Sequence, residues 1–188
     1  MKKAVVAAVA ILLLFAVAAC GGSGKAKAKL GTEEKKVAAN IAKSFTSDSS
    51  GALTATEASC FADDFVGSVG LDKLKQAKLI NADDQLNQAN AKFDTPLATQ
   101  FAKSFLGCVD YQKKQAQVIA SADPKVNAAK LEACLVKEMP SSYVTKLIVA
   151  SYTQTSDSTA LLNESTKKLT DCKTQATTAT PSTSPSAK

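Results

Sequence analysis

The 188-residue chain contains no histidine, no tryptophan and no arginine, and all of its 23 basic residues are lysines. Histidine is the usual acid–base catalyst near neutral pH and the commonest metal ligand. Arginine is the residue best suited to bidentate contacts with phosphates and guanine bases. We therefore expect a protein that is not an enzyme, has no cofactor and no metal site, and does not bind nucleic acid.

The net charge of +6 is unevenly distributed along the chain. Between Lys25 and Lys43 there are six lysines and two acids, whereas residues 44–173 carry 14 lysines and 15 acids. The basic character therefore belongs to the N-terminal region. Beside a membrane such lysines are attracted to anionic lipid, and the alternative is a solvated, flexible tether. The candidate membrane-proximal lysines are Lys25, Lys27, Lys29, Lys35 and Lys36.

The N-terminus has the residue pattern of an export signal. Lys2 and Lys3 precede an apolar run of 16 residues, which is shorter than the ~20 residues that a membrane-spanning helix needs. Val17-Ala18-Ala19-Cys20 follows and resembles the lipobox of bacterial lipoproteins, with Val17 in place of the favoured leucine. The resemblance implies lipidation of the Cys20 thiol, cleavage before Cys20, and a membrane-anchored protein at the outer face of the cytoplasmic membrane of a bacterium. The alternatives are an ordinary secretory signal and an uncleaved anchor.

The rest of the chain predicts an all-α fold, because apolar residues recur at steps of three and four and no segment alternates with a period of two. Helix starts are predicted at Thr54, Thr95-Pro96 and Asp123-Pro124, and a short helix is predicted over 71–80. Val37, Ile41 and Phe45, spaced by four residues, predict a further helix nearer the N-terminus. The expected organisation is a signal peptide over 1–19, a Gly/Lys tether over 20–53 with one short helix at about 33–46, a helical domain over 54–173, and a disordered Thr/Ser/Pro tail over 174–188.

Two stretches of the helical domain match when they are aligned on their cysteines, which predicts a duplicated helical unit at about 54–108 and 124–172. Each unit has an early cysteine, Cys60 or Cys134, and a closing one, Cys108 or Cys172. Four cysteines in an exported chain favour disulfides and allow three pairings. The duplication selects Cys60–Cys108 and Cys134–Cys172.

The domain also resembles a group of exported helical proteins of high-GC Gram-positive bacteria. The resemblance lies in the early cysteine, the segment Phe105-Leu106-Gly107-Cys108-Val109-Asp110, a later Cys-Leu and a closing cysteine. It implies the same helical fold and disulfides, and it implies no activity.

Two further patterns could carry a function. Phe61, Phe65, Phe101 and Phe105 of the first unit form either an apolar pocket or part of the core. Ser165 and Lys168 have the Ser-x-x-Lys spacing of penicillin-recognising enzymes, but the companion motifs are absent. The sequence favours a non-enzymatic binding or interaction module of unknown specificity, with another envelope protein or an apolar ligand as its expected partner. The alternatives are a carrier or sensor of an apolar ligand and an enzyme of unknown type.

Overall fold

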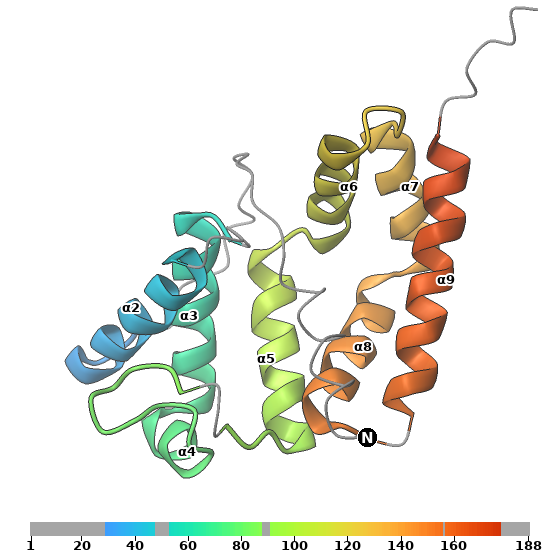
Figure 1. Ribbon diagram of the computed structural model, residues 1–188. Coiled ribbons are helices and arrows are strands. Elements are labelled where there is room, and N and C mark those ends of the chain that lie inside the picture. Colours follow the sequence, from blue (N-terminus) through green and yellow to red (C-terminus); the bar gives the residue numbers. More distant parts are fainter. Residues whose placement is uncertain (1–28, 48–52, 88–90, 156, 178–188) are drawn as a thin grey trace, which may run out of the picture.

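The computed structural model describes residues 29–47, 53–87, 91–155 and 157–177 (Figure 1). Within these ranges the chain forms eight helices and no strand, which confirms the all-α fold. The signal peptide, Cys20, residues 20–28 and 48–52 of the expected tether, and most of the expected tail lie outside the described residues. The helices are α2 (Thr32–Ser47), α3 (Ala55–Val69), α4 (Leu71–Gln76), α5 (Thr95–Cys108), α6 (Tyr111–Ala122), α7 (Ala128–Glu138), α8 (Ser141–Thr153) and α9 (Ser158–Ala176).

Side-chain caps fix several of the helix starts. Thr54 and Glu57 form a capping box at the start of α3, as their spacing predicts. The Asp94 carboxylate accepts a hydrogen bond from Leu97 N–H at 2.8 Å and begins α5, with Pro96 in the first turn. Asp110 caps α6 in the same way, at the break that separates α5 from α6.

Two helix boundaries differ from the prediction. The helix expected over 71–80 ends at Gln76, because Lys78 adopts a positive φ of 55° and the chain turns there. The helix expected from Asp123-Pro124 begins only at Ala128, capped by Asn127. Before this cap, Val126 is buried and bridges to Thr177 beyond α9, so tertiary contacts hold this segment out of the helix.

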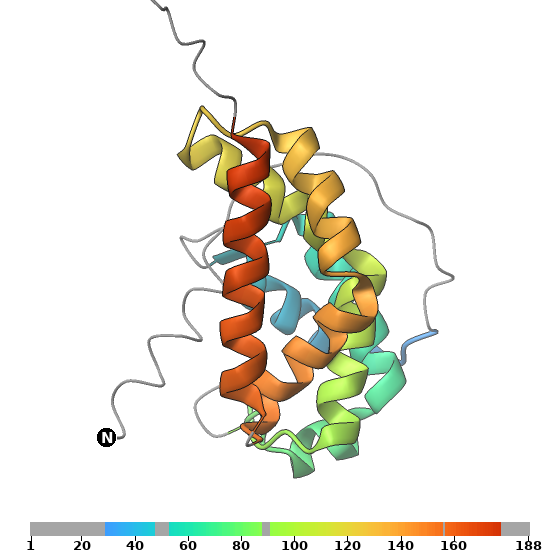
Figure 2. The same cartoon turned by 90° about the vertical axis from the view of Figure 1, so that its right-hand side faces the viewer.

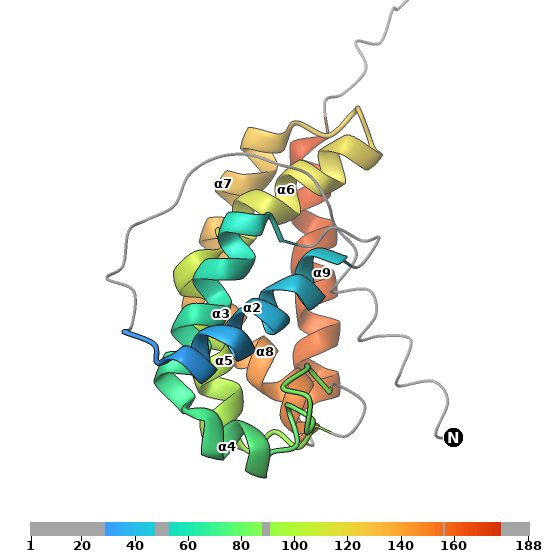
Figure 3. The ribbon, with the colours of Figure 1, turned by 90° about the vertical axis from the view of Figure 1, so that its left-hand side faces the viewer.

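Four helices follow one another across the molecule in the order α3, α5, α8 and α9 (Figure 1), and each contacts the next. Helix α2 lies across α3 (Figure 3), and α6 and α7 lie at the end of the molecule from which the chain leaves α9 (Figure 2). α6 packs on α7 and α7 on α9, as α2 packs on α3 and α3 on α5. The contacts of α2, α3 and α5 therefore recur in α6, α7 and α9.

The interior divides into two clusters that follow this repetition. The first is built from α2 to α5 and contains Phe61 and Leu74, and the second is built from α6 to α9 and contains Leu131 and Leu147. Ile148 of α8 contacts both clusters. Each cluster is thus built by four helices, which adds α2 to the unit expected over 54–108 and α6 to the unit expected over 124–172, and α5 and α8 join the two units.

Helix α2 belongs to the folded body rather than to a tether. Val37 and Ile41 are 0% and 1% exposed and pack in the first core. The Lys36 ammonium lies 3.0 Å from the Asp84 carboxylate, and Lys75 lies 2.9 Å from Glu33. The expected tether over 20–53 is therefore corrected for 32–47, because the apolar stripe of this helix is covered by α3.

Candidate functional site

The four cysteines of the helical domain form the two predicted disulfides. Cys60 pairs with Cys108 at a Cα–Cα distance of 5.7 Å, and Cys134 pairs with Cys172 at 5.5 Å. Each bridge joins the second helix of a unit to the fourth, α3 to α5 and α7 to α9. Cys20, the predicted lipidation site, lies outside the described residues.

The predicted membrane-proximal lysines are only partly placed. Lys25 and Lys27 lie outside the described residues, whereas Lys29, Lys35 and Lys36 are exposed. The Lys36 ammonium already forms an ion pair with the Asp84 carboxylate.

The four phenylalanines proposed as an apolar pocket form a packed aromatic cluster instead. The Phe61 ring lies 5.6 Å from Phe65, 5.0 Å from Phe101 and 6.1 Å from Phe105, measured between ring centroids. Phe61 and Phe65 are almost fully buried, and edge-to-face contacts fill the space between the rings. None of the four rings lines the pockets described below, so they are core residues.

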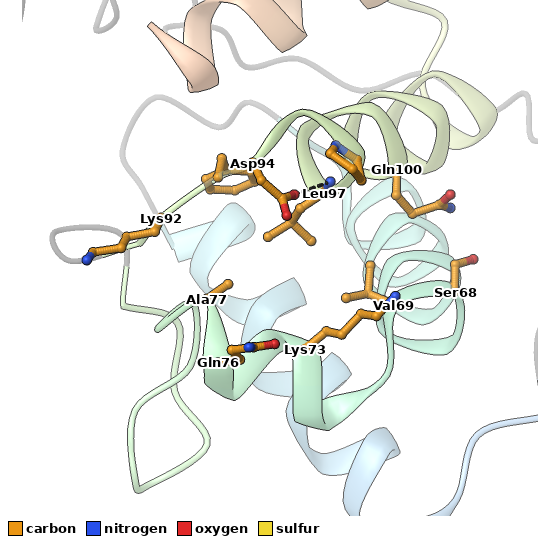
Figure 4. Close-up of a pocket in the computed structure, with 11 residues that line it drawn as sticks. Ser68, Val69, Lys73, Gln76, Ala77, Lys92, Asp94, Leu97 and Gln100 are labelled. Carbon is orange, nitrogen blue, oxygen red and sulfur yellow. Dashed lines mark hydrogen bonds between the residues drawn. The ribbon is translucent and has the colours of Figure 1, made fainter.

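The largest of these pockets, of about 710 Å³, opens beside this cluster, between α4 and the start of α5 (Figure 4). We call it the α4–α5 pocket. Its apolar lining comes from Val69 at the end of α3, from Ala77 just after α4, and from Phe93, Pro96 and Leu97 before and within the first turn of α5. Polar and charged residues of the same elements complete the lining. The residues are Ser68, Val69, Lys73, Gln76, Ala77, Lys92, Phe93, Asp94, Pro96, Leu97 and Gln100.

The charges around the α4–α5 pocket differ in how they are compensated. Asp94 accepts the hydrogen bond from Leu97 N–H, at the positive end of the α5 dipole. Lys73 has no carboxylate within 4.0 Å among the described residues and runs along the edge where α3 meets α4 (Figure 4). Lys92 is also unpaired within the described part of the chain but points away from the pocket (Figure 4). The lining thus combines apolar side chains with two lysines that have no carboxylate partner among the described residues, and of these two Lys73 is the one that lies along the pocket edge.

Two smaller pockets lie in the second half of the molecule. One, of about 460 Å³, is lined by Val109, Val136 and Pro140 among others, and no lysine lines it. The other, of about 660 Å³, lies between α6 and α9, and its lysine, Lys173, is 2.9 Å from Asp123. In neither pocket is a lysine left without a carboxylate partner.

The most buried ion pair in the described part of the chain joins Lys114 of α6 to Glu57 of α3. Burial opposes ionisation of Glu57, but hydrogen bonds from Lys114 Nζ and from the Thr54 backbone outweigh it and hold the pKa of Glu57 below its usual value. Burial raises the pKa of Tyr111 and of Tyr152 to about 12. These groups connect helices, and none of them lines a pocket described above.

The Ser-x-x-Lys spacing in α9 does not form a catalytic pair. Ser165 donates its hydroxyl hydrogen to the Leu162 carbonyl, and Lys168 lies between Glu138 and Glu164, about 3.6–3.7 Å from each. Nor do three metal-ligating side chains gather anywhere in the described ranges.

The residues of the α4–α5 pocket were not identified from the sequence, although a signal was available. In the alignment on the cysteines, exposed Lys73 occupies the position of Leu147, which is buried in the second core. The polar residue in place of an apolar one therefore coincides with the place where the first unit has a pocket.

None of the described helices is long and apolar enough to cross a membrane. Comparison of the chain with protein-family models, with curated proteins and with solved structures finds no match.

Proposed function

We propose that this protein is a bacterial cell-surface lipoprotein. Cys20 carries the lipid at the outer face of the cytoplasmic membrane, and the two-unit helical domain is a non-enzymatic binding or interaction module. Two or three acyl chains on one residue hold a protein at a bilayer far more firmly than a single chain.

One observation carries this proposal. The chain has five cysteines, and the four in the helical domain pair with one another. Cys20 is therefore the cysteine left over, and it follows two small residues at the end of an apolar run. Paired cysteines also agree with an oxidising compartment outside the cytoplasm.

The role of a binding module is supported by the placement of the ionisable groups. The Glu57 carboxylate, whose pKa is lowered, pairs with Lys114 of another helix and lines none of the three pockets, so it links helices rather than facing a ligand. A general base in an enzyme would need to lie within reach of a bound substrate, whereas Glu57 lies between two helices.

Metabolic labelling with an alkyne-tagged fatty acid in a bacterial host tests the anchor. We expect the wild-type protein to be labelled and to sediment with membranes. Cys20→Ala should lose the label and should either leave the membrane fraction or remain unprocessed. Mass spectrometry of the mature protein should show an acylated N-terminal Cys20.

The matched control removes two cysteines of the helical domain instead of Cys20. The double variant Cys60→Ala/Cys108→Ala lacks the first disulfide but keeps Cys20, and it should remain labelled. If Cys20→Ala still incorporates the fatty acid, the proposed anchor is wrong.

A second candidate function is a carrier or sensor of an apolar ligand in the first unit. The α4–α5 pocket favours it, since Phe93 and Leu97 line this pocket and its volume lies within the range of roughly 300–1,000 Å³ that is typical of small-molecule sites. The site of such a ligand is this pocket rather than the phenylalanine cluster.

A further inference from the structure

The α4–α5 pocket marks a difference between the two units. When Cys60 is aligned with Cys134, Lys73 takes the position of Leu147, and Gln76 takes that of Ala150. Leu147 and Ala150 are 2% and 5% exposed in the second unit. Their counterparts Lys73 and Gln76 are exposed at the pocket.

The opposite wall shows the same difference. When the closing cysteines, Cys108 and Cys172, are aligned, Asp94 takes the position of Ser158. Ser158 donates its hydroxyl hydrogen to the Ala150 carbonyl at 2.7 Å, which ties the end of α8 to the start of α9. In the first unit the equivalent residues, Gln76 and Asp94, line different sides of the pocket (Figure 4). The second unit is therefore closed where the first is open.

The open pocket is held by backbone contacts. Lys92 N–H donates to the Ala77 carbonyl at 2.9 Å, and Asn87 N–H donates to the Leu79 carbonyl at 2.7 Å. Leu74 of α4 and Leu79, three residues after its end, are buried in the first core. These contacts fix the pocket wall without filling the pocket, so the cavity is built into the fold.

We propose that the α4–α5 pocket binds a small amphiphile that carries one anionic head group. The apolar part lies against Val69, Phe93 and Leu97, and the head group pairs with the Lys73 ammonium. Anionic ligands are favoured because Lys73 has no carboxylate partner among the described residues, while the carboxylate of Asp94 lies at the positive end of the α5 dipole, which offsets part of its charge. The proposal rests on the proposed function only in treating the domain as a binding module, and it does not depend on the lipid at Cys20.

Decanoate is a suitable probe, because it combines one carboxylate with a short apolar chain. The protein is the chain from residue 20 onward with Cys20→Ser, which cannot be acylated on that sulfur. Both cores and both disulfides lie within residues 29–177, so this form retains what holds the domain together. We expect saturable NMR shift changes at the amides of residues 68–77 and 92–100.

A matched pair of charge variants tests the role of Lys73. Lys73→Gln should weaken decanoate binding roughly tenfold, the loss expected for one charge-assisted contact. Lys146→Gln removes an exposed lysine of α8 and should leave the affinity unchanged. Decyltrimethylammonium, of similar chain length and opposite charge, should not shift the pocket amides.

A closing variant gives the pocket the residues of the second unit. Lys73→Leu/Gln76→Ala should abolish binding while the thermal unfolding midpoint stays the same or rises. The proposal is overturned if shifts do not saturate, if they lie outside the pocket, if both lysine variants lose affinity equally, or if the cationic amphiphile binds equally well. None of these outcomes affects fatty-acid labelling at Cys20, so the two proposals fail separately.

Discussion

At the scale of single residues, the contact between Lys114 and Glu57 does two things at once. The Glu57 carboxylate completes the capping box with the Thr54 backbone and also accepts a hydrogen bond from Lys114 in the other unit. The side chains of Lys114 and Glu57 are largely buried, with 14% and 21% exposed. The same carboxylate therefore fixes the start of α3 and links the two units.

Replacing Lys114 by methionine should lower the free energy of unfolding at pH 7 by about 1 kcal/mol, because a partly buried charged hydrogen bond is lost while the capping box remains. The pKa of Glu57 is lowered in the folded protein, so its stabilising effect is present above the usual value of 4.5 and is lost as the pH falls through the folded pKa. Urea titrations from pH 7 to pH 3 should therefore show the difference from wild type shrinking with acid.

Lys113→Met is the control for this prediction, because it removes the neighbouring lysine, which has no ion pair within the described residues. It should change the free energy of unfolding by less than about 0.5 kcal/mol. A Lys114→Met deficit that is equally large at pH 3 would mean that the effect comes from packing rather than from the charge.

The capping box was predictable from Thr54 and Glu57, since both residues lie within one helical turn. The partner of Glu57 was not, since Lys114 lies 57 residues away in the sequence and is brought near only by tertiary packing.

At the scale of helices, α2 shows how a local pattern can be interpreted correctly and placed wrongly. The four-residue spacing of Val37, Ile41 and Phe45 predicted the helix. The lysine-rich, glycine-containing sequence before it suggested a tether, and periodicity does not say which surface covers an apolar stripe. In the structure α3 covers it.

Replacing Ile41 by alanine should therefore lower the free energy of unfolding by about 2–4 kcal/mol, because a fully buried side chain of the first core is truncated. Lys35→Ala, on the exposed side of the same helix, should change it by less than about 0.5 kcal/mol. Thermal or urea unfolding measures both. If both variants changed the free energy of unfolding by equally small amounts, α2 would be part of a tether and not of the folded body.

The disulfide pairing could be predicted because duplication is a long-range constraint that is visible in the sequence. The register of the cysteines selected one of three pairings, and the structure has that pairing. The register could not show that α4 has six residues and α8 thirteen, since helix length depends on tertiary contacts. The α4–α5 pocket follows from that difference in length.

At the scale of the whole molecule, the two disulfide-closed units are joined through α8. Its Ile148 contacts both cores, and its Tyr152 ring lies 4.4 Å from Phe93 and 4.8 Å from Phe101, measured between centroids. Helix α8 belongs to the second unit by sequence, but this side of it completes the core of the first. The first unit thus depends on the second for part of its apolar burial.

This dependence predicts that the two units unfold together and that cutting the contacts of α8 uncouples them. In the double variant Ile148→Ala/Tyr152→Ala, peptides from α3 and α5 should lose hydrogen-exchange protection at a lower urea concentration than peptides from α7 and α9. Leu161→Ala/Leu162→Ala truncates two partly buried residues that contact only the second core, and it should move both midpoints together. If the α3 and α5 peptides lost protection at the same urea concentration as the α7 and α9 peptides in both double variants, α8 would not be what couples the units. The first unit would then unfold together with the second even without the side chains of Ile148 and Tyr152.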